Sequence, residues 1–309
     1  MINFRYHVVS LTAVFLALAI GLVVGTAALN GPLLDAINDE VNSLRGNNSQ
    51  LREQVNHLKD EVNREEEFIT AAAPRVLHRS LANRRVLLLT LPGGRDHAEG
   101  VAGMLTTAGA RITARVDVED KFTDPRNGVE LLDLSDHALP ASVSGGSIPA
   151  NSDGVETASA LLAAVLLDRT PTVTEADRRA VVAAYDAAGY LNVDDRVTGP
   201  AELAVIVAGL PYTDREATEK NKAVVTLTDQ FDKAGAVVVA GVGVAGTGNV
   251  VSVVRGDPAL SKTVSTVDNA GTAQGQLVTA LAAAEQLAGR IGQYGLGGGA
   301  QAMLPTLAP

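Results

Sequence analysis

The chain has 309 residues, of which 46% are hydrophobic and 19% charged, and this balance is typical of a folded protein with one or two domains. Its formal net charge of −10 argues against a nucleic-acid partner, because binding to phosphates needs clustered Lys and Arg. The chain contains 0 Cys, which excludes disulfides, thiolate metal sites and cysteine nucleophiles. With 5 His and 3 Met, it also has few ligands for soft metals.

The first long apolar run predicts a membrane anchor. From Val8 to Leu29 the chain carries no charge, and as a helix this run is about 33 Å long, enough to cross a hydrocarbon core of about 30 Å. A cleaved signal peptide is the alternative, but its apolar core is usually only about 7 to 15 residues long. We therefore expect residues 1–29 to form a short cytoplasmic start and an uncleaved anchor that holds the protein in the membrane lipid bilayer.

Charges on either side of this run predict the orientation. Arg5 precedes it, whereas Asp35, Asp39 and Glu40 follow it, and the positive-inside rule then places the N-terminus in the cytoplasm. The bulk of the chain is expected to be extracytoplasmic.

Small residues recur every fourth position within the predicted anchor. Ala13, Ala17, Gly21 and Gly25 form a ladder that ends in G-x-x-x-G, a pattern that lets two membrane helices approach closely. The alternative is that Ala and Gly are simply common in such helices.

Residues 30–73 predict a parallel two-stranded coiled coil. Heptad position a holds Leu34, Val41, Asn48, Val55, Val62 and Ile69, and position d holds Ile37, Leu44, Leu51 and Leu58. Mostly β-branched a positions with Leu at d favour a parallel homodimer, in which Glu40 and Arg45 can pair between chains. The pattern fails at Glu65, and Pro74 is expected to end the helix.

Asn48 interrupts the apolar pattern at one a position. In a parallel dimer the two asparagines hydrogen-bond to each other, which specifies register and strand number at a cost in stability. The alternative is one amphipathic helix folded against its own domain. The narrow a/d stripe and the polar residues at the other positions favour the dimer.

Residues 74–294 predict a Rossmann-like α/β domain with a mostly parallel sheet. Continuous apolar strands alternate with helices, which is the pattern of an α/β layer. Strands are expected at Arg85–Leu91, about 111–116, within 201–211 and at 236–242. Helices are expected at about 96–108, after the Thr174 cap, at about 215–234 and from 273. Residues 121–153 are expected to be irregular, and 295–309 to be a flexible tail.

Two glycine-rich stretches imitate nucleotide-binding motifs. Gly241, Gly243 and Gly246 match G-x-G-x-x-G after an apolar strand, but the residues that follow are strand-like in pattern, so we interpret the stretch as a turn between strands. The stretch "LPGGRDHAEG" lacks the Lys-Ser/Thr of a P-loop. Neither stretch predicts a cofactor.

Metal-binding and catalytic patterns are equally sparse. The pairs Asp96-His97 and Asp136-His137 are the only places in the folded part where an imidazole and a carboxylate stand together, and a metal site usually needs three or four ligands. They form a copper site only if folding joins them. No catalytic motif is found, and we do not expect an enzyme.

Two segments carry a family resemblance. "NFRYHVVSLTAVFLALAIGLVVG" at the start, and "STVDNAGTAQGQ" with its residues Thr266, Val267, Asp268 and Asn269, resemble the matching segments of the MctB family of mycolate-walled actinobacteria. The order of anchor, coiled coil and α/β domain also agrees. The resemblance implies copper efflux or copper homeostasis by a pore-forming component of the cell envelope, associated with the outer membrane.

A related group, SteB, resembles the chain equally well in layout. This resemblance implies a dimeric coiled-coil protein that, with a partner called SteA, regulates a peptidoglycan hydrolase during cell separation and has no transport activity of its own. A pore needs a closed barrel or several helices around a polar lumen, and copper handling usually shows Cys, Met or His clusters. The sequence predicts neither, so copper transport rests on the resemblance alone.

Overall fold

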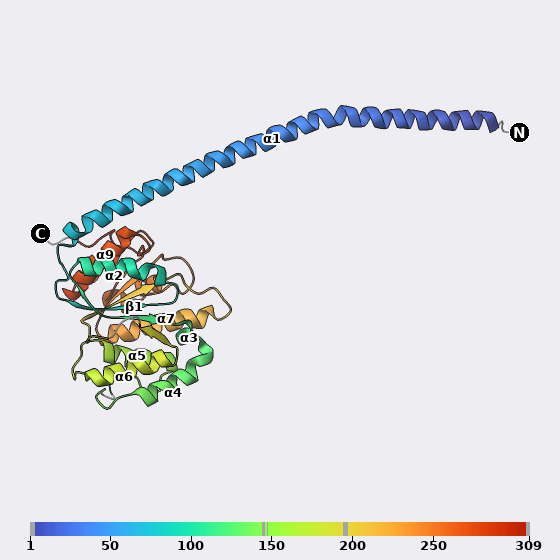
Figure 1. Ribbon diagram of the computed structural model, residues 1–309. Helices are drawn as coiled ribbons and strands as arrows, with labels where there is room; N and C mark the ends of the chain where they lie inside the picture. Colours follow the sequence, from blue (N-terminus) through green and yellow to red (C-terminus); the bar gives the residue numbers. More distant parts are fainter. Residues whose placement is uncertain (1–3, 144–145, 147, 194–196, 307–309) are drawn as a thin grey trace. The chain divides into compact units, whose positions relative to one another are not determined.

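The computed structural model describes residues 4–143, 146, 148–193 and 197–306, with the backbone alone described at 28–34 and 36. The chain divides into two units, Met1–Glu65 and Glu66–Pro309. The first consists of one long helix, α1 (Phe4–Leu77), which continues into the second (Figure 1). Within α1 the stretch Phe4–Ala27 contains an 18-residue window with a mean hydropathy of 2.6, and the stretch is long and apolar enough for a membrane span.

The last turns of α1 belong to the second unit. Ala73, Leu77 and Leu81 are buried there in one cluster with Val101 and Leu105. The expectation that Pro74 ends the helix is therefore wrong, because α1 continues past Pro74 and ends at Leu77. A proline inside a helix removes one hydrogen bond and costs about 3 kcal/mol. Burial of the apolar side chains on both sides of it offsets that cost.

A mostly parallel sheet forms the centre of the second unit. Its strands are β1 (Arg85–Thr90), β2 (Arg111–Val118), β3 (Leu191–Val193), β4 (Leu203–Ala208), β5 (Ala236–Gly241), β6 (Val264–Val267) and β7 (Gln293–Tyr294). In the described part of the chain they form a seven-stranded sheet in the order β3-β2-β1-β4-β5-β6-β7. β3 runs antiparallel to β2, and every other pair is parallel. The predicted α/β class with a mostly parallel sheet is confirmed.

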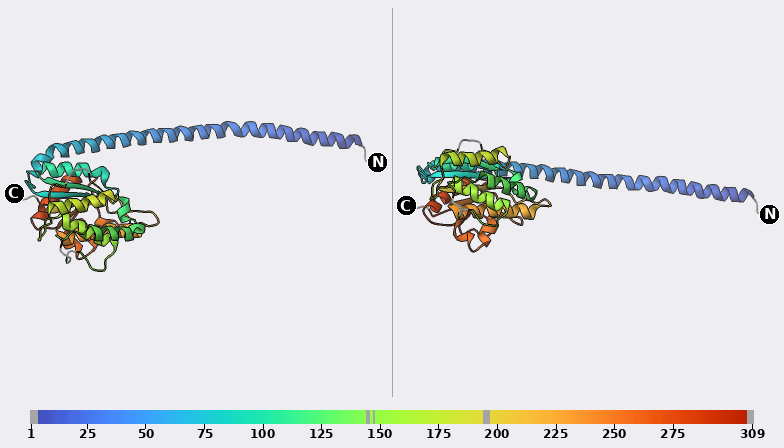
Figure 2. Two further views of the ribbon diagram at one scale, coloured as in Figure 1. Left: turned by 60° about the horizontal axis from the view of Figure 1, so that its bottom comes forward. Right: turned by 90° about the horizontal axis from the view of Figure 1, so that it is seen from below.

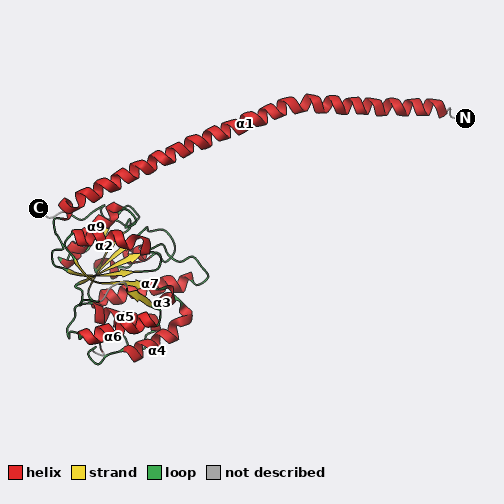
Figure 3. Cartoon of the chain, in the orientation of Figure 1, coloured by secondary structure: helices red, strands yellow, loops and turns green. Residues whose placement is uncertain are grey.

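Helices cover both faces of this sheet (Figure 3). One face carries α2 (Arg95–Thr107) and α9 (Ala273–Leu287). The other face carries α3 (Asp120–Thr123), α4 (Gly128–Ala138), α5 (Gly154–Leu166), α6 (Glu175–Ala187), α7 (Ala217–Ala234) and α8 (Val250–Gly256). Short 3-10 turns lie at Pro125–Asn127 and Leu260–Lys262. Two further views show the same layers (Figure 2).

Strand side chains alternate between the two layers. In β1, Val86 and Leu88 face the α2 and α9 layer, whereas Leu87 and Leu89 face the opposite layer. Both sets are buried, as expected for parallel strands with helices on both faces. This double burial explains why the strands appear in the sequence as continuous apolar runs.

The predicted Thr174 cap is confirmed, and two glycines end helices of the second unit. The Thr174 hydroxyl accepts a hydrogen bond from the Asp177 backbone N–H at 3.1 Å and caps α6. Gly109 and Gly189, which follow α2 and α6, have φ angles of +88° and +73°. Glycine adopts this left-handed conformation without steric cost, and both helices end there.

Residues 121–153 are more helical than predicted. α4 lies within this stretch, and its Ser135 hydroxyl lies 2.7 Å from the Tyr185 hydroxyl of α6. Leu131, one turn earlier, is fully buried. The Gly, Ser and Pro content suggested irregular structure, but packing against neighbouring helices stabilises a helix here.

Residues 250–256 form a helix where a strand-like pattern was expected. The Asn249 carboxamide oxygen accepts hydrogen bonds from the backbone N–H groups of Val251 (3.0 Å) and Ser252 (3.3 Å). This cap, together with burial of Val250 and Val254 four residues apart, outweighs the strand preference of a valine-rich sequence. The predicted turn between two strands is therefore a turn between a strand and a helix.

Candidate functional site

The carboxyl ends of β1 and β4 form the topological switch point of the sheet. The connection after β1 leads to α2 on one face, and the connection after β4 leads to α7 on the other. In open α/β sheets, ligands bind in the crevice at this point. A cavity of about 370 Å³ lies here and is lined by Pro92, Gly93, Arg95, Asp120, Leu210, Pro211, Tyr212, Thr213 and Asp214.

The charged groups of this switch-point cavity are paired with one another or with near neighbours. Arg95 Nη2 lies 2.5 Å from Glu119 Oε1, and Lys220 Nζ lies 2.6 Å from Asp214 Oδ2. The Tyr212 hydroxyl donates to Asp120 Oδ1 at 2.8 Å. Burial raises the pKa of this hydroxyl above its ordinary value, so it stays protonated as a donor at neutral pH.

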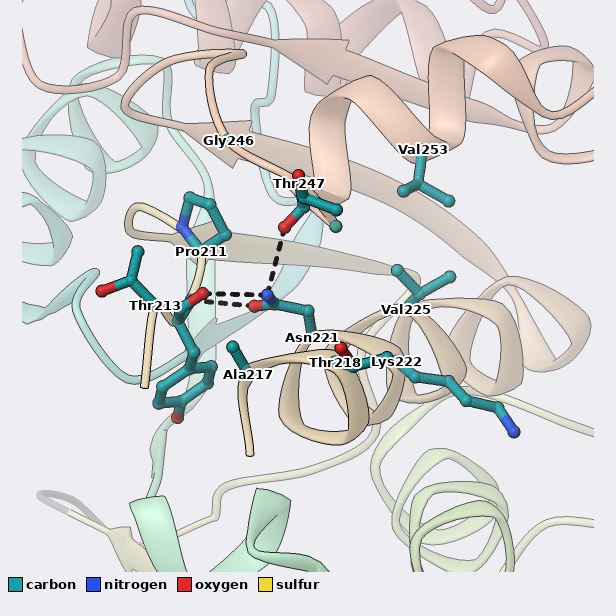
Figure 4. Close-up of a pocket in the computed structure, with 12 residues that line it drawn as sticks. Pro211, Thr213, Ala217, Thr218, Asn221, Lys222, Val225, Gly246, Thr247 and Val253 are labelled. Carbon is teal, nitrogen blue, oxygen red and sulfur yellow. Dashed lines mark hydrogen bonds between the residues drawn. The ribbon is translucent and has the colours of Figure 1, made fainter. Parts of the chain in front are cut away.

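A second and larger cavity lies on the other side of the Pro211–Thr213 loop. Its volume is about 500 Å³, and it lies between the start of α7, the start of α8 and the loop after β5. It is lined by Pro211, Tyr212, Thr213, Ala217, Thr218, Asn221, Lys222, Val225, Gly246, Thr247, Gly248 and Val253. Figure 4 shows Pro211 on one side and Val225 and Val253 on the other. We call it the α7/α8 cavity.

Asn221 fixes the two loops that border the α7/α8 cavity. Its side-chain oxygen accepts from the Tyr212 N–H at 2.8 Å. Its amide nitrogen donates to the carbonyl oxygens of Tyr212 (3.1 Å) and Thr247 (3.2 Å), and Figure 4 shows the bond to Thr247. The side chain is buried, so these bonds hold the loops without competition from water.

The glycine-rich stretch after β5 allows the two loops to approach each other. A Cβ atom on Gly246 would lie 2.5 Å from the Pro211 ring, and one on Gly248 would lie 2.7 Å from Asn221 Cβ. Both glycines also have positive φ angles, which other residues rarely adopt. The predicted motif residue Gly241 packs against Val251, where a Cβ atom would lie 2.5 Å from a methyl group. Gly246 and Gly248 form part of the cavity wall by close packing.

The family-motif residues lie at the carboxyl end of β6. Asp268 and Arg255 of α8 form an ion pair, 2.8 Å between Oδ2 and Nη1. Arg255 Nε donates to the Thr266 hydroxyl at 2.9 Å, and Val267 is fully buried. Asn269 is buried, and its side-chain oxygen has no hydrogen-bond partner among the described residues.

The described part of the predicted tail, residues 295–306, is hydrogen-bonded to this motif. Asp268 accepts from the backbone N–H groups of Leu296 (2.8 Å) and Gly297 (2.9 Å). Arg255 donates to the carbonyl oxygens of Tyr294 (2.6 Å) and Gly298 (3.0 Å). The glycine content predicted a flexible tail, but these hydrogen bonds hold the described part of the segment against the domain. Residues 307–309 lie outside the described residues.

The structure does not bring the candidate metal ligands together. Asp96 and His97 stand at the start of α2, and Asp136 and His137 stand at the end of α4, on the opposite face of the sheet. His137 Nδ1 lies 2.7 Å from the Asp133 carbonyl oxygen, a hydrogen bond that raises the pKa of its imidazole. Among the described residues, no three His, Asp or Glu side chains are grouped as a metal site requires.

The predicted dimer residues lie along one exposed helix. Their exposed fractions run from 36% at Val41 to 59% at Leu51, and Ile37, Leu44, Val55, Leu58 and Val62 fall between these values. Asn48 is exposed among them. Gly21 and Gly25 have open space where a Cβ atom would stand. The side chain of Leu34 lies outside the described residues.

Three residues that shape these sites were not predicted from the sequence. Asn221 and Tyr212 come from α7 and the loop before it, and Arg255 comes from α8. The one local signal in the sequence that could have identified Asn221 is a polar side chain on the apolar face of the predicted helix. Arg255 follows a run of valines that was interpreted as a strand, so its contact with Asp268 was not expected.

Comparisons with known proteins identify the family. The family model described as "Copper transport outer membrane protein, MctB" matches residues 1–305. The chain is 27% identical to the copper transporter MctB of Mycobacterium tuberculosis (strain H37Rv), over 98% of this chain and 99% of that protein. It is 28% identical to the copper transporter MctB of Mycobacterium leprae (strain TN), over 97% and 98%. The chain therefore belongs to the MctB family of copper transport outer membrane proteins.

Proposed function

We propose that the protein acts in copper homeostasis at the cell envelope, as a membrane-anchored homodimer whose α/β domain lies outside the cytoplasm. The observation that carries this proposal is the family match over residues 1–305. The relatives named copper transporters match over nearly their full length, so the likeness includes the helix and the α/β domain together.

The anchor part of the proposal rests on α1. The apolar stretch Phe4–Ala27 is long enough to span a bilayer, and acidic residues follow it whereas Arg5 lies at its start. Mass spectrometry of the protein purified from membranes tests retention, since peptides from before Leu29 are expected. Because the chain has 0 Cys, a single Ser49→Cys variant tests orientation. An impermeant maleimide is expected to label it in whole cells, and labelling only after lysis contradicts the orientation.

The dimer part rests on the heptad stripe. Large apolar side chains such as Leu44, Leu51 and Leu58 are more than half exposed on a single helix, and a second copy of the same stripe is the partner that heptad spacing fits. Glu40 and Arg45 at flanking positions add charge complementarity between parallel strands.

The α/β domain fits a binding role better than the wall of a pore. Its parallel strands are buried on both faces by helices, whereas strands of a membrane pore face lipid on one side. The described residues contain one helix long and apolar enough to cross a membrane. A single such helix could line a polar lumen only together with helices from other copies or from another protein. We therefore propose that the domain supports copper efflux through contacts with a partner, and we propose no enzymatic activity for it.

A second candidate function is regulation of cell separation, as the SteB resemblance implies. The observation that favours it is the exposed heptad stripe with Asn48, combined with the lack of grouped metal ligands in the described part of the chain. In this alternative the dimer binds a SteA-like protein or a peptidoglycan hydrolase and does not transport copper.

A deletion strain distinguishes the two functions. The copper proposal predicts a lower inhibitory copper concentration and higher cell copper after deletion, restored by the wild-type gene. It also predicts poor restoration by Leu44→Lys with Leu58→Lys, because these changes disrupt the stripe. Full restoration is expected for the matched surface change Ser43→Lys with Gln50→Lys, since both residues occupy position c, away from the stripe. Chaining of cells at normal copper tolerance would contradict the copper proposal and support the alternative. A deletion strain that shows neither copper sensitivity nor chaining would contradict both functions.

A further inference from the structure

Phe68 is a large aromatic side chain that stands in solvent on the last part of α1. It is 74% exposed. Among the described residues it is the one exposed aromatic outside residues 1–29, since the other phenylalanines and tyrosines there are buried or half-buried. Aromatic side chains are enriched at protein interfaces and contribute much of the binding energy. In a single chain, Phe68 leaves most of its apolar surface in water.

One side of α1 packs against its own domain at this level. Ala73 and Leu77 are buried there, at 2% and 0% exposed. Glu66 and Ile69 are half-buried on the same side, within about 40° of Ala73 around a helix that turns about 100° per residue. Phe68 lies about 140° from Ala73 around the helix, so it faces away from its own domain. All of these residues belong to the second unit.

The heptad seam lies between these two sides of α1. Beyond Glu65, which interrupts the pattern, the apolar spacing resumes with Ile69 at position a and Ala72 at position d. Ala73 then occupies an e position on one flank of the seam, and Phe68 occupies a g position on the other flank. The α/β domain therefore covers the e flank of its own helix, and the g flank is left open.

The symmetry of a parallel dimer brings the open flank of one helix beside the covered flank of the other. In a parallel two-stranded coiled coil, a g residue lies beside the e residue of the following heptad on the partner strand. For Phe68 that residue is the partner subunit's Ala73. Ala73 is covered by the domain of its own chain, where it shares a cluster with Val101 and Leu105 of α2. A domain that covers the e flank thus lies next to the g flank of the opposite helix.

From this geometry we infer that Phe68 of each chain packs against the α/β domain of a second copy, beside its α2. The inference rests on the proposed dimer and deepens it. The coiled coil joins the two helices, and two symmetry-related Phe68 contacts hold the two domains in a fixed arrangement beside them. Ala71 and Ala72 flank Phe68 around the helix, and their small side chains leave room for the partner's domain to approach.

Photo-cross-linking in the full chain tests this contact. The photoreactive residue p-benzoylphenylalanine replaces Phe68, Leu51 or Val129 in separate chains. Each chain is mixed in detergent with isotope-labelled wild-type chain and reconstituted in nanodiscs, so that mass spectrometry separates links between copies from links within one. Leu51, at position d, reports on the coiled coil alone. Val129, 84% exposed on α4, is the matched control on the domain surface.

We expect position 68 to link to the α/β domain of the labelled copy, position 51 to link to its helix, and position 129 to give no link between copies. Links from position 51 without links from position 68 to the partner's domain would keep the dimer and overturn the inference. Links from position 68 only within its own chain would also overturn it. No link between copies from either position would contradict the proposed dimer as well.

Subunit exchange between detergent-solubilised dimers gives a second measure. Phe68→Ala is expected to speed exchange between labelled and unlabelled chains at least about tenfold, because each dimer loses two buried aromatic contacts. Native mass spectrometry follows the exchange, and thermal unfolding verifies that the variants are folded. Val129→Ala is the matched control and is expected to exchange at the wild-type rate. A folded Phe68→Ala variant that exchanges as slowly as wild type would overturn the inference.

Discussion

Arg255 and Asp268 form an almost fully buried ion pair, with 4% and 3% of their side chains exposed and 2.8 Å between Nη1 and Oδ2. Each partner also binds the backbone of the C-terminal segment, Arg255 at Tyr294 and Gly298 and Asp268 at Leu296 and Gly297. The pair thus joins α8, the end of β6 and the C-terminal segment. When one partner of a buried ion pair is removed, the remaining charge loses its electrostatic stabilisation, and water cannot reach it to replace that stabilisation.

The first prediction concerns this pair. Asp268→Asn is expected to lower the free energy of unfolding by about 3 to 5 kcal/mol, because the Arg255 guanidinium stays charged and buried without its carboxylate. Urea unfolding measures the loss. Glu175→Gln, which removes one partner of the exposed Arg179 pair, is the control and is expected to change the free energy by about 0.5 kcal/mol or less. A loss below about 1 kcal/mol for Asp268→Asn would refute a stabilising role for the pair.

The second prediction compares two glycines of the C-terminal segment. Gly295 has a φ angle of +127°, and a Cβ atom there would lie 2.1 Å from Asp268 Oδ1, whereas Gly298 has open space. Gly295→Ala is expected to lower the free energy of unfolding by about 1 to 3 kcal/mol, and Gly298→Ala to leave it nearly unchanged. Limited proteolysis is expected to release the segment faster in Gly295→Ala alone. Equal behaviour of the two variants would contradict the close contact with Asp268.

The class of the fold could be predicted from the sequence because it depends on local patterns. Parallel strands buried on both faces, such as β4 and β5, appear as unbroken apolar runs, and Thr174 and Gly189 mark helix ends through their own chemistry. By contrast, α5 received no assignment. Every residue from Thr157 to Leu166 is buried, so the helix lacks the amphipathic pattern by which a surface helix is recognised.

The sites could not be predicted because they depend on contacts between distant residues. Asn221 joins two loops because its side chain donates a hydrogen bond to Thr247, and Arg255 donates hydrogen bonds to Asp268 and Gly298. No pattern in sequence encodes such distances. Gly246 was noticed because it belongs to a stretch that imitates a nucleotide motif, but its close packing against Pro211, and that of Gly248 against Asn221, appear only in the folded chain.

The third prediction uses two aspartates with opposite pKa shifts. Burial raises the pKa of Asp232, which accepts from the Thr263 hydroxyl at 2.7 Å, whereas backbone N–H groups of Leu260 and Ala259 lower the pKa of Asp257. A raised carboxyl pKa means that the folded state binds the proton more tightly, so stability falls as pH rises above about 4. For Asp257 the contribution has the opposite sign and is lost as pH falls.

Substitution by Asn is therefore expected to separate these two positions. At neutral pH, Asp232→Asn stabilises the fold and Asp257→Asn destabilises it, and both differences shrink in acid, where the wild-type carboxyls are protonated. Urea unfolding between pH 3 and pH 8 measures this, with the pH values chosen to bracket an ordinary carboxyl pKa of about 4. Destabilisation by Asp232→Asn at neutral pH would contradict the assigned shift.

The fourth prediction concerns Asn48 in the heptad stripe. Asn48→Val is expected to raise the thermal stability of the coiled coil, because a buried polar group becomes a packed hydrophobe, and to loosen its preference for two parallel strands. Light scattering and thermal unfolding of a soluble fragment from Asn30 measure both effects. Asn47→Val, at the neighbouring position outside the a/d stripe, is the control. A monomer before and after the change would refute the coiled coil.

The last prediction is that the part of the chain beyond the anchor, from Asn30 on, binds copper only weakly. Cu(I) prefers thiolate and thioether sulfur, and this part contains no Cys and only Met104 and Met303 as thioethers. Cu(II) prefers imidazole, but His97 and His137 lie in helix layers on opposite faces of the sheet. Isothermal titration calorimetry of the dimer with Cu(II), and with Cu(I) under reducing conditions, is expected to give dissociation constants well above 1 μM.

The double variant His97→Ala with His137→Ala is expected to leave this weak binding unchanged, and His57→Ala serves as the matched control from the helical unit. Submicromolar affinity that is lost in the double variant would show that the two histidines meet in solution, and it would favour direct transport by this domain. Weak binding in all three proteins, together with copper sensitivity of the deletion strain, requires that the protein acts on copper through the envelope or a partner.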